Sequence, residues 1–243
     1  MDKMLLYPAG SSESCGYASR FLKNCGISLV DHPTPEITHL LLDIPGNDAP
    51  DLKGILRMLP EDITVIGGKL NREILKGYRK IDLLQDPLFL ARNAAITAEC
   101  ALQAAAPYIK TTFADTPALI LGWGRIGKCL AALLSAIGCP VTVAARKESD
   151  LAMLNALGYR AVDFSHIPQI IGDIQILFNT APNLKPDPKM TSLWNSVVKI
   201  DLASYPGLEY EDVIPARGLP GKYAPESAGK LIAESILRIS KEE

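Results

Sequence analysis

The sequence has few of the side chains that most often bind metals or act as nucleophiles. Its 243 residues include three histidines and five cysteines, and the cysteines form no C-x-x-C pair: Cys15, Cys25, Cys100, Cys129 and Cys139. An odd number of unclustered cysteines argues against a disulfide framework and a zinc site, and is typical of a reducing compartment. We therefore expect a cytoplasmic protein without a bound metal, and the sequence offers no Ser/His/Asp constellation.

The sequence also lacks a strong net charge and a long apolar segment. The formal charge of −2 gives no sign of a nucleic acid or anionic membrane partner. The longest uncharged run, residues 129–145, is divided by Gly138 and Pro140, so it does not predict a membrane span. The first ten residues, MDKMLLYPAG, are too short in apolar length to predict a signal peptide. A globular protein that contacts neither nucleic acid nor membrane is expected.

The most informative stretch is 117–147. Residues 118–121 form a short apolar run that predicts a buried strand, and a G-x-G-x-x-G motif follows at once: Gly122, Trp123, Gly124, Arg125, Ile126 and Gly127. Residues 128–137 are apolar at helical spacing, Gly138 stands where a helix would end, and 141–144 predict the next strand. A glycine motif between a strand and a helix, followed by a second strand, indicates a dinucleotide-binding turn.

Each glycine of this motif has a physical role in such a turn. Gly122 allows the sharp exit from the strand, Gly124 lets a pyrophosphate approach the backbone, and Gly127 lets the helix pack close to the sheet. Free N–H groups at the helix N-terminus would then hold the phosphates. The alternative is a glycine-rich turn of an α/β domain that binds no ligand.

The end of the second strand predicts which dinucleotide is bound. NAD-binding turns place a carboxylate there for the ribose 2′-hydroxyl, whereas this chain has Ala145, Arg146 and Lys147, with Arg146 22 positions after Gly124. Arginine can hold a 2′-phosphate with two parallel N–H donors, and lysine adds charge. The sequence therefore predicts NADP. The alternative is an ordinary solvated strand end.

The remaining pattern predicts an α/β fold of two parts. Short strands at 4–7, 27–30, 39–44, 63–66 and 81–84 alternate with helices, which predicts a flavodoxin-like lobe over residues 1–90. A helix over 86–110, opened by Asp86 and Pro87, would join the lobes. Residues 91–243 are then a doubly wound parallel sheet of the Rossmann type, with strands at 118–121, 141–144, 160–163, 174–178, 197–201 and 213–216, and a final helix at 226–240.

Ligands of such a sheet bind beyond the carboxyl ends of its strands. Two small, polar loops follow the strands at 174–178 and 197–201, and we assign the nicotinamide half of the cofactor to them: Asn179, Thr180, Ala181, Asp201, Ala203 and Ser204. A third loop, near a helix start, could bind a carboxylate with its N–H groups and the lysine: Leu219, Pro220, Gly221 and Lys222. The alternatives are ordinary loop composition and a solvated lysine.

No acid–base pair can be assigned from the residue pattern. The histidines, His32, His39 and His166, lie outside the loops beyond the strand ends and outside the glycine motif. Glu99, on the helix between the lobes, is the best-placed carboxylate. Asn93 and Thr97 precede it on the same helix, and the alternative for all three is a solvated helix face.

Over about residues 91–240 the chain resembles the A-type subunit of bacterial dipicolinate synthase. The resemblance rests on GWGRIGKCLAALLSAIGCPVTVAARK, NTAP, DLASYPG and GLPGKYAPESAG, and on the N-A-x-x-T-A-E pattern from Asn93 to Glu99. It implies an NADP-dependent oxidation of dihydrodipicolinate to dipicolinate, the spore-core chelator made during sporulation. It also implies a flavoprotein-like partner, the B-type subunit of that enzyme, and a cyclic dicarboxylate substrate near Asn93, Thr97, Glu99 and Lys222.

Two features depart from this family. The first lobe is shorter than usual, and Glu226 stands where the family has lysine. Replacing a cation by an anion beside a dicarboxylate would weaken its binding. Two alternatives follow: an NADP-dependent dehydrogenase of another small carboxylate, and a dinucleotide-binding subunit without activity. The alanine-rich helix and the last helix could also pair protomers in a homo-oligomer, or only join the lobes.

Overall fold

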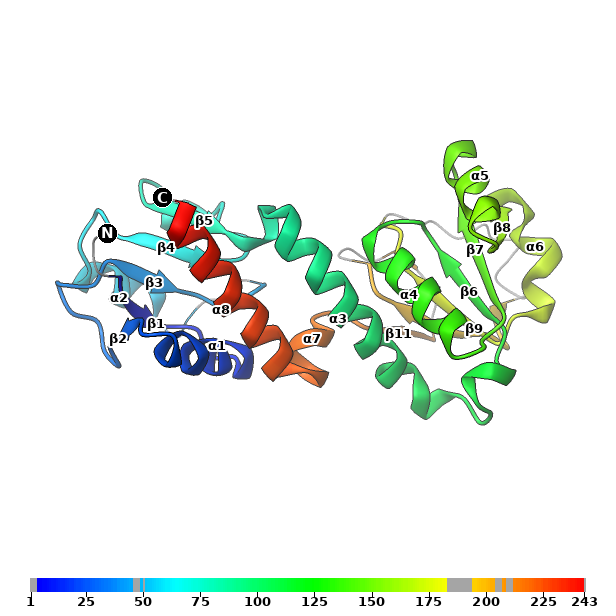
Figure 1. The fold of residues 1–243 in the computed structure, drawn as a ribbon, viewed down its shortest axis with the longest axis horizontal. Helices are drawn as coiled ribbons and strands as arrows, with labels where there is room; N and C mark the ends of the chain where they lie inside the picture. The colour runs from blue at the N-terminus through cyan, green and yellow to red at the C-terminus, as the bar shows by residue number, and fades with distance from the viewer. Residues whose placement is uncertain are drawn as a thin grey trace. The chain divides into compact units, whose positions relative to one another are not determined.

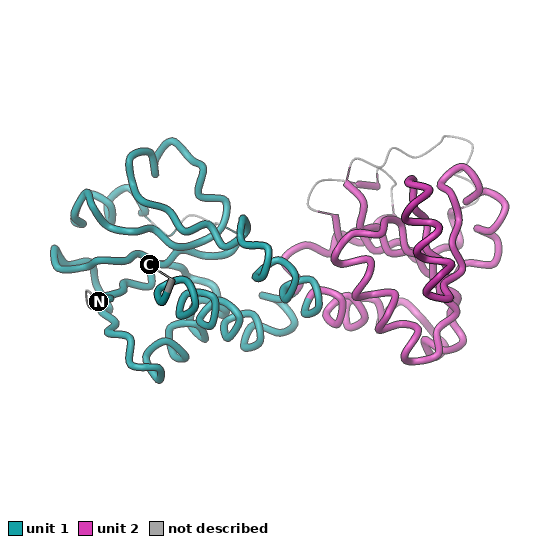
Figure 2. The backbone as a smooth tube through the Cα atoms, turned by 45° about the horizontal axis from the view of Figure 1, so that its top comes forward, with its two compact units in different colours: residues 1–96, 220–243 teal, residues 97–219 magenta. Residues whose placement is uncertain are grey.

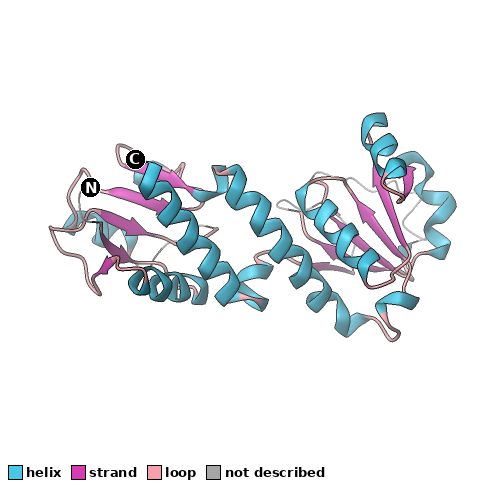
Figure 3. Ribbon diagram, in the orientation of Figure 1, coloured by secondary structure: helices cyan, strands magenta, loops and turns pink. Residues whose placement is uncertain are grey.

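The computed structural model describes residues 4–45, 49, 51–182, 194–203, 207–208 and 212–242. The chain forms two compact units, shown in different colours in Figure 2. Unit 1 contains Met1–Ile96 together with Pro220–Glu243, and unit 2 contains Thr97–Leu219. Each unit holds its own parallel sheet with helices beside it (Figure 3).

Unit 1 is built on a five-stranded sheet with the order β2-β1-β3-β4-β5, all strands parallel. This is the flavodoxin-like strand order expected from the sequence. Figure 1 labels its strands and α-helices. The elements are β1 (Leu5–Pro8), α1 (Glu13–Asn24), β2 (Ser28–Leu29), β3 (His39–Leu41), α2 (Leu52–Met58), β4 (Thr64–Gly67), η1 (Glu73–Leu75), β5 (Arg79–Asp82), η2 (Leu83–Gln85) and α8 (Pro225–Glu242).

Unit 2 is built on a six-stranded parallel sheet with the order β11-β10-β9-β6-β7-β8. Numbered from β6, this is the order of the doubly wound Rossmann fold, which confirms the predicted fold class. Its elements are η3 (Ala106–Tyr108), η4 (Phe113–Asp115), β6 (Ala118–Leu121), α4 (Arg125–Ala136), β7 (Val141–Ala145), α5 (Glu148–Ala156), β8 (Arg160–Asp163), η5 (Phe164–His166), α6 (Ile167–Ile170), η6 (Ile171–Asp173), β9 (Ile176–Asn179), β10 (Val198–Asp201) and β11 (Val213–Pro215).

Two helices continue from one unit into the other: α3 (Pro87–Ala105) and α7 (Leu219–Tyr223). The start of α3 follows the expected signal, since the amide of Leu88 donates to the carboxylate of Asp86. The segment that contains Leu219, Pro220, Gly221 and Lys222 was expected to be a loop, but it forms the short helix α7. Proline in the first turn of a helix loses no hydrogen bond, so a Leu-Pro-Gly run does not exclude a helical turn.

The C-terminal helix α8 belongs to unit 1, although the sequence-based boundary at residue 90 placed it in the second domain. Its apolar residues Leu231, Ile232 and Ile236 share a core with strand and helix residues of the first sheet. Gly229 allows the helix to lie against α1, because a Cβ there would be 2.5 Å from Cβ of Tyr17. Helical spacing identifies an apolar face but not its partner, so the sequence could not show that the chain returns.

Both sheets bury continuous apolar strands. All four residues of β6 and of β9 are buried, as are all four of β4. Strands covered on both faces are expected in parallel sheets, where polar side chains concentrate at the strand ends. Among the described residues, no helix is long and apolar enough to span a membrane.

Candidate functional site

The turn between β6 and α4 has the geometry that its glycines predict. Gly122 has a φ of +103°, a conformation that favours glycine, and a Cβ there would lie 2.9 Å from Oγ1 of Thr180. A Cβ on Gly127 would lie 2.3 Å from the carbonyl oxygen of Gly122. Packing inside the protein therefore requires both glycines, which hold the start of α4 tightly against the end of β6.

Gly124 differs from its two neighbours in the motif. Its backbone is extended, and a Cβ built on it meets no atom within 4 Å among the described residues. Its position at the start of α4 carries no side-chain cap. Protein packing therefore leaves space directly over the backbone at the helix N-terminus, where a pyrophosphate would bind. The residues present fit a dinucleotide.

The first turn of α4 carries positive charge. Arg125 opens the helix, Lys128 follows one turn later, and the first turn has no acidic residue. Cations at a helix N-terminus are unfavourable unless an anion is bound there. The ammonium of Lys128 lies 5.7 Å from the ring centre of Trp123, whose ring in turn packs edge-on against Tyr159 at 5.7 Å. Ile126 is half-buried. The rings of Trp123 and Tyr159 thus pack together beside the turn, and the N-terminal end of α4 carries positive charge.

The end of β7 presents two cations and no carboxylate. Ala145 is buried, while Arg146 and Lys147 are exposed. The guanidinium of Arg146 lies over the ring of Phe164, 5.1 Å from its centre. The nearest strand end carries Asp163, paired with Ala145 in the sheet register. Hydrogen bonds from the hydroxyl and amide of Ser165 hold the carboxylate of Asp163 and keep its pKa below the usual value.

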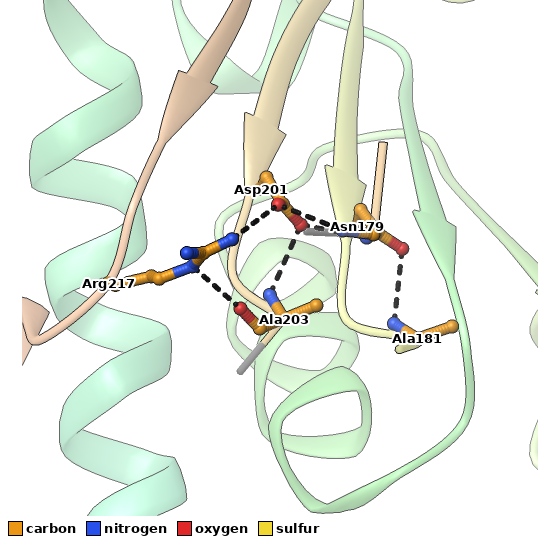
Figure 4. A network of polar contacts seen from close by, with 6 residues as sticks. Asn179, Ala181, Asp201, Ala203 and Arg217 are labelled. Atoms are coloured by element: carbon orange, nitrogen blue, oxygen red, sulfur yellow. Dashed lines mark hydrogen bonds and ion pairs between the residues drawn. The ribbon is translucent and has the colours of Figure 1, made fainter. Parts of the chain in front are cut away.

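The ends of β9 and β10 are tied together by side chains, as Figure 4 shows. The amide Nδ2 of Asn179 donates to Oδ1 of Asp201 at 2.8 Å, and both side chains are buried. Oδ1 of Asn179 accepts from the amide of Ala181 at 3.1 Å, and Oδ1 of Asp201 accepts from the amide of Ala203 at 3.3 Å. These two side chains hold the loop backbones in place and are engaged within the protein.

Two further contacts complete this network. Oδ2 of Asp201 accepts from the amide of Gly207 at 3.3 Å and lies 3.6 Å from Nη2 of Arg217. Thr180 donates its hydroxyl to the carbonyl oxygen of Leu121 at 2.9 Å, which links the end of β9 to β6. Ser204, also assigned to the cofactor, lies outside the described residues.

The residues assigned to the substrate lie on α3 and α7. Asn93 and Thr97 are four residues apart and share one face of α3, whereas Glu99 is exposed and two positions further on. Asn93 belongs to unit 1, and Thr97 and Glu99 to unit 2. On α7, Leu219 is buried and Lys222 is exposed, with its ammonium 5.1 Å from the ring centre of Tyr223.

Several residues of the site were not found from the sequence. Lys128 and Tyr159 lie beside the cofactor turn, Phe164 lies beside Arg146, and Gly207 donates to Asp201. Lys128 directly follows the glycine motif, so its charge could have been noticed. The others lie on neighbouring strands or loops, and only the sheet order brings them to the site. Across the described part of the chain, no three metal-binding side chains cluster.

Comparison with known proteins gives a consistent result, although no family model matches the chain. The A-type subunit of dipicolinate synthase from Bacillus subtilis is 26% identical over 186 residues, which cover 73% of this chain and 61% of that protein. The match therefore spans less than two thirds of the length of this curated relative.

Solved structures share the complete fold. The A-type subunit of dipicolinate synthase from Bacillus halodurans superposes with a TM-score of 0.80 at 20% identity and covers 98% of both chains. A transhydrogenase from Sinorhizobium meliloti superposes with a TM-score of 0.72 at 13% identity, over 98% of this chain and 93% of that one. These structures therefore share with this chain the arrangement of two α/β units. Taken with the sequence match, these comparisons confirm the resemblance to the A-type subunit of dipicolinate synthase that the sequence predicted.

Proposed function

We propose that the protein is an NADP-dependent oxidoreductase that converts dihydrodipicolinate to dipicolinate. The observation that carries the proposal is the β6–α4 turn, where Gly124 leaves open space at a helix N-terminus flanked by Arg125 and Lys128. This geometry suits a pyrophosphate. The substrate is taken from the family that the chain resembles.

The choice of NADP over NAD rests on the end of β7. A 2′-phosphate beside Arg146 and Lys147 would gain charge-assisted hydrogen bonds, and no carboxylate occupies the position that would hold a free 2′-hydroxyl. The ring of Phe164 restricts the guanidinium of Arg146. A restricted guanidinium loses less side-chain entropy when it binds a phosphate.

The reaction needs little from protein side chains. Dihydrodipicolinate gives a hydride to NADP and a proton to solvent or a weak base, so the products are dipicolinate, NADPH and a proton. Formation of the aromatic ring drives both losses. This agrees with strand-end loops in which Asn179 and Asp201 hold the backbone. A fixed backbone orients bound groups without reorganisation.

Two partners follow from the family and belong to the proposal. The substrate is a cyclic dicarboxylate, and the second protein is a flavoprotein-like B-type subunit. Glu226, which stands where the family has lysine, is exposed in the first turn of α8, where its charge favours the helix. Its carboxylate therefore has a structural role that does not require contact with substrate.

The test is NADPH formation from enzymatically generated dihydrodipicolinate, followed by absorbance, with and without the B-type subunit. We expect product with NADP and much less with NAD. The Gly124→Ala variant should form less NADPH at the same NADP concentration. Its added methyl group would occupy the cofactor turn but would meet no described protein atom within 4 Å, so the fold should be unaffected. Absence of NADPH in both arms, while calorimetry still detects NADP binding, would contradict the proposed reaction.

A second candidate is a dinucleotide-binding subunit without activity of its own. It is favoured by the engagement of the Asp201 carboxylate, which accepts hydrogen bonds from Asn179, Ala203 and Gly207 and is therefore not free to act as a base. The same assay separates the two candidates. A protein of this kind would bind NADP and leave the rate of dipicolinate formation unchanged after Glu99→Gln and Lys222→Ala.

A further inference from the structure

We propose that Arg217 binds a carboxylate of the substrate, and that Asp201 and the carbonyl oxygen of Ala203 position its guanidinium for this. The inference rests on the proposed function, because it names a substrate group within the same site. Arg217 lies two residues after the end of β11. It directly follows Ala216, whose amide donates to the carbonyl oxygen of Asp201 at 2.8 Å.

Two contacts fix the guanidinium (Figure 4). Its Nε donates to the carbonyl oxygen of Ala203 at 3.2 Å, and its Nη2 lies 3.6 Å from Oδ2 of Asp201. The second distance is that of an ion pair without a good hydrogen bond. A guanidinium has five N–H donors, so these two contacts leave donors for a further anion.

The burial of the two partners differs strongly. The Asp201 side chain is 4% exposed and that of Arg217 is 45% exposed. Asp201 already accepts hydrogen bonds from Asn179, Ala203 and Gly207, so its carboxylate is satisfied without the arginine. Arginine is therefore not needed to neutralise an otherwise unpaired carboxylate. The pair instead directs a half-exposed guanidinium along the carboxyl edge of the sheet.

The sheet order places this guanidinium beyond the nicotinamide. Arg146 marks the 2′-phosphate side at β7, and the β6–α4 turn marks the pyrophosphate, so the other half of the dinucleotide extends toward β9 and β10. Arg217 follows β11, which is three strand positions from β6, or about 14 Å at the usual strand spacing. A substrate stacked on the nicotinamide would present its outer carboxylate there.

A purely structural role for Arg217 predicts different behaviour. If the guanidinium only fastened the segment around Ala203, its removal would lower thermal stability and NADP affinity together. A carboxylate-binding role predicts that NADP affinity and the melting temperature stay nearly unchanged, while affinity for a carboxylate falls. Planar, two-donor recognition also predicts that lysine restores only part of the affinity.

The experiment measures binding of three probes to the NADP-saturated protein by calorimetry: pyridine-2,6-dicarboxylate, pyridine-2-carboxylate and acetate. The variants are Arg217→Gln and Arg217→Lys. Arg160→Gln is the matched control, because Arg160 is an exposed arginine at the opposite, amino edge of the same sheet. We expect Arg217→Gln to weaken the dicarboxylate about 10-fold or more, from loss of one charge-assisted contact. Arg217→Lys should fall between, and Arg160→Gln should match the wild type.

Failure of this inference and failure of the proposed function give different results. Equal dicarboxylate affinity of wild type and Arg217→Gln overturns the role of Arg217 and leaves the proposed substrate standing. Arginine-dependent binding of another carboxylate only, without the dicarboxylate, supports Arg217 and contradicts the substrate. No binding of any of the three probes contradicts both.

Discussion

The two sheets begin with the same strand–turn–helix arrangement but treat the helix N-terminus in opposite ways. In unit 1 the turn between β1 and α1 is closed by a carboxylate: Asp43, 4% exposed, accepts from the amides of Ser11 and Ser12 at 2.9 and 3.1 Å. Ser12 caps α1 by accepting from the amide of Cys15. In unit 2 the turn between β6 and α4 has no side-chain cap.

The first turns of α1 and α4 also carry opposite charges. The first turn of α1 carries Glu13, whereas that of α4 carries Arg125 and no acid. A helix N-terminus binds anions only where its own chain has not already satisfied it. The comparison therefore shows why, of two similar turns, that of unit 2 is the one suited to a dinucleotide. In unit 1 the protein supplies the anion itself.

The largest expected effect is that of Gly124→Ala on cofactor binding. A methyl group over the turn would push the pyrophosphate away from the backbone N–H groups and break one or more charge-assisted bonds. NADP affinity should fall on the order of 100-fold, which corresponds to about 3 kcal/mol. The measurement is calorimetric titration with NADP.

The control for this prediction is stability. A Cβ at Gly124 meets no described atom within 4 Å, so the melting temperature should change little. Gly127→Ala offers the contrast, because its Cβ would lie 2.3 Å from a carbonyl oxygen and should destabilise the fold. Unchanged NADP affinity in a well-folded Gly124→Ala protein would remove the turn from the binding site.

The second-largest effect concerns unit 1, where a substitution should lower stability and leave NADP affinity unchanged. The backbone amides of Ser11 and Ser12 donate to both carboxylate oxygens of Asp43. Asp43→Asn replaces one of these oxygens by an NH₂ group, which cannot accept, so some of these hydrogen bonds are lost. We expect a loss of about 1–3 kcal/mol in the free energy of unfolding, measured with urea. NADP affinity should remain that of the wild type. Loss of NADP binding without loss of stability would show that the comparison assigns the turns wrongly.

A smaller effect is expected for cofactor preference. Arg146→Gln removes one of the two cations at the end of β7, while Lys147 remains. The preference for NADP over NAD, taken as the ratio of their dissociation constants, should fall about 10-fold. Arg160→Gln should leave the ratio unchanged, because Arg160 lies on the neighbouring strand β8 at its amino end, away from the carboxyl ends where the cofactor would bind. An unaltered ratio in Arg146→Gln would place the 2′-phosphate elsewhere.

The smallest effect is a pH dependence in unit 1. Burial, and next the charge of Asp43, raise the pKa of the Cys15 thiol to about 12. The unfolded thiol ionises near pH 9 and the folded one does not, so stability is complete below pH 9 and falls as the pH rises toward 12. Between pH 8 and 10 this loss is about 1 kcal/mol. Urea unfolding of Cys15→Ala should show a shallower decline, and an equal decline would contradict the assignment.

The local elements of unit 2 could be predicted well because their signals are local. Alternation of apolar strands with helices predicted the sheet, and the glycine spacing predicted the turn, where φ of Gly122 and the contact at Gly127 leave no other residue. The end of β7 could be located for the same reason. All of these depend on residues that are close in the chain.

What could not be predicted depends on contacts between distant residues. The bond between Asn179 and Asp201 joins residues 22 positions apart, and the closure of α1 by Asp43 spans more than 30. Both polar pairs exist because the strand order brings two strand ends together. The return of α8 to unit 1 is another such contact, since its apolar face would have fitted either sheet. The ion pair between Arg217 and Asp201 is a further contact of this kind, because it joins residues on two neighbouring strand ends.

Hydrogen exchange with and without NADP tests the central contrast most directly. Amides of residues 124–128 at the start of α4 should become protected when NADP is added, and those of residues 11–16 at the start of α1 should keep their rates. Protection confined to the start of α1, or none at the start of α4 at saturating NADP, would contradict the assignment of the dinucleotide to unit 2.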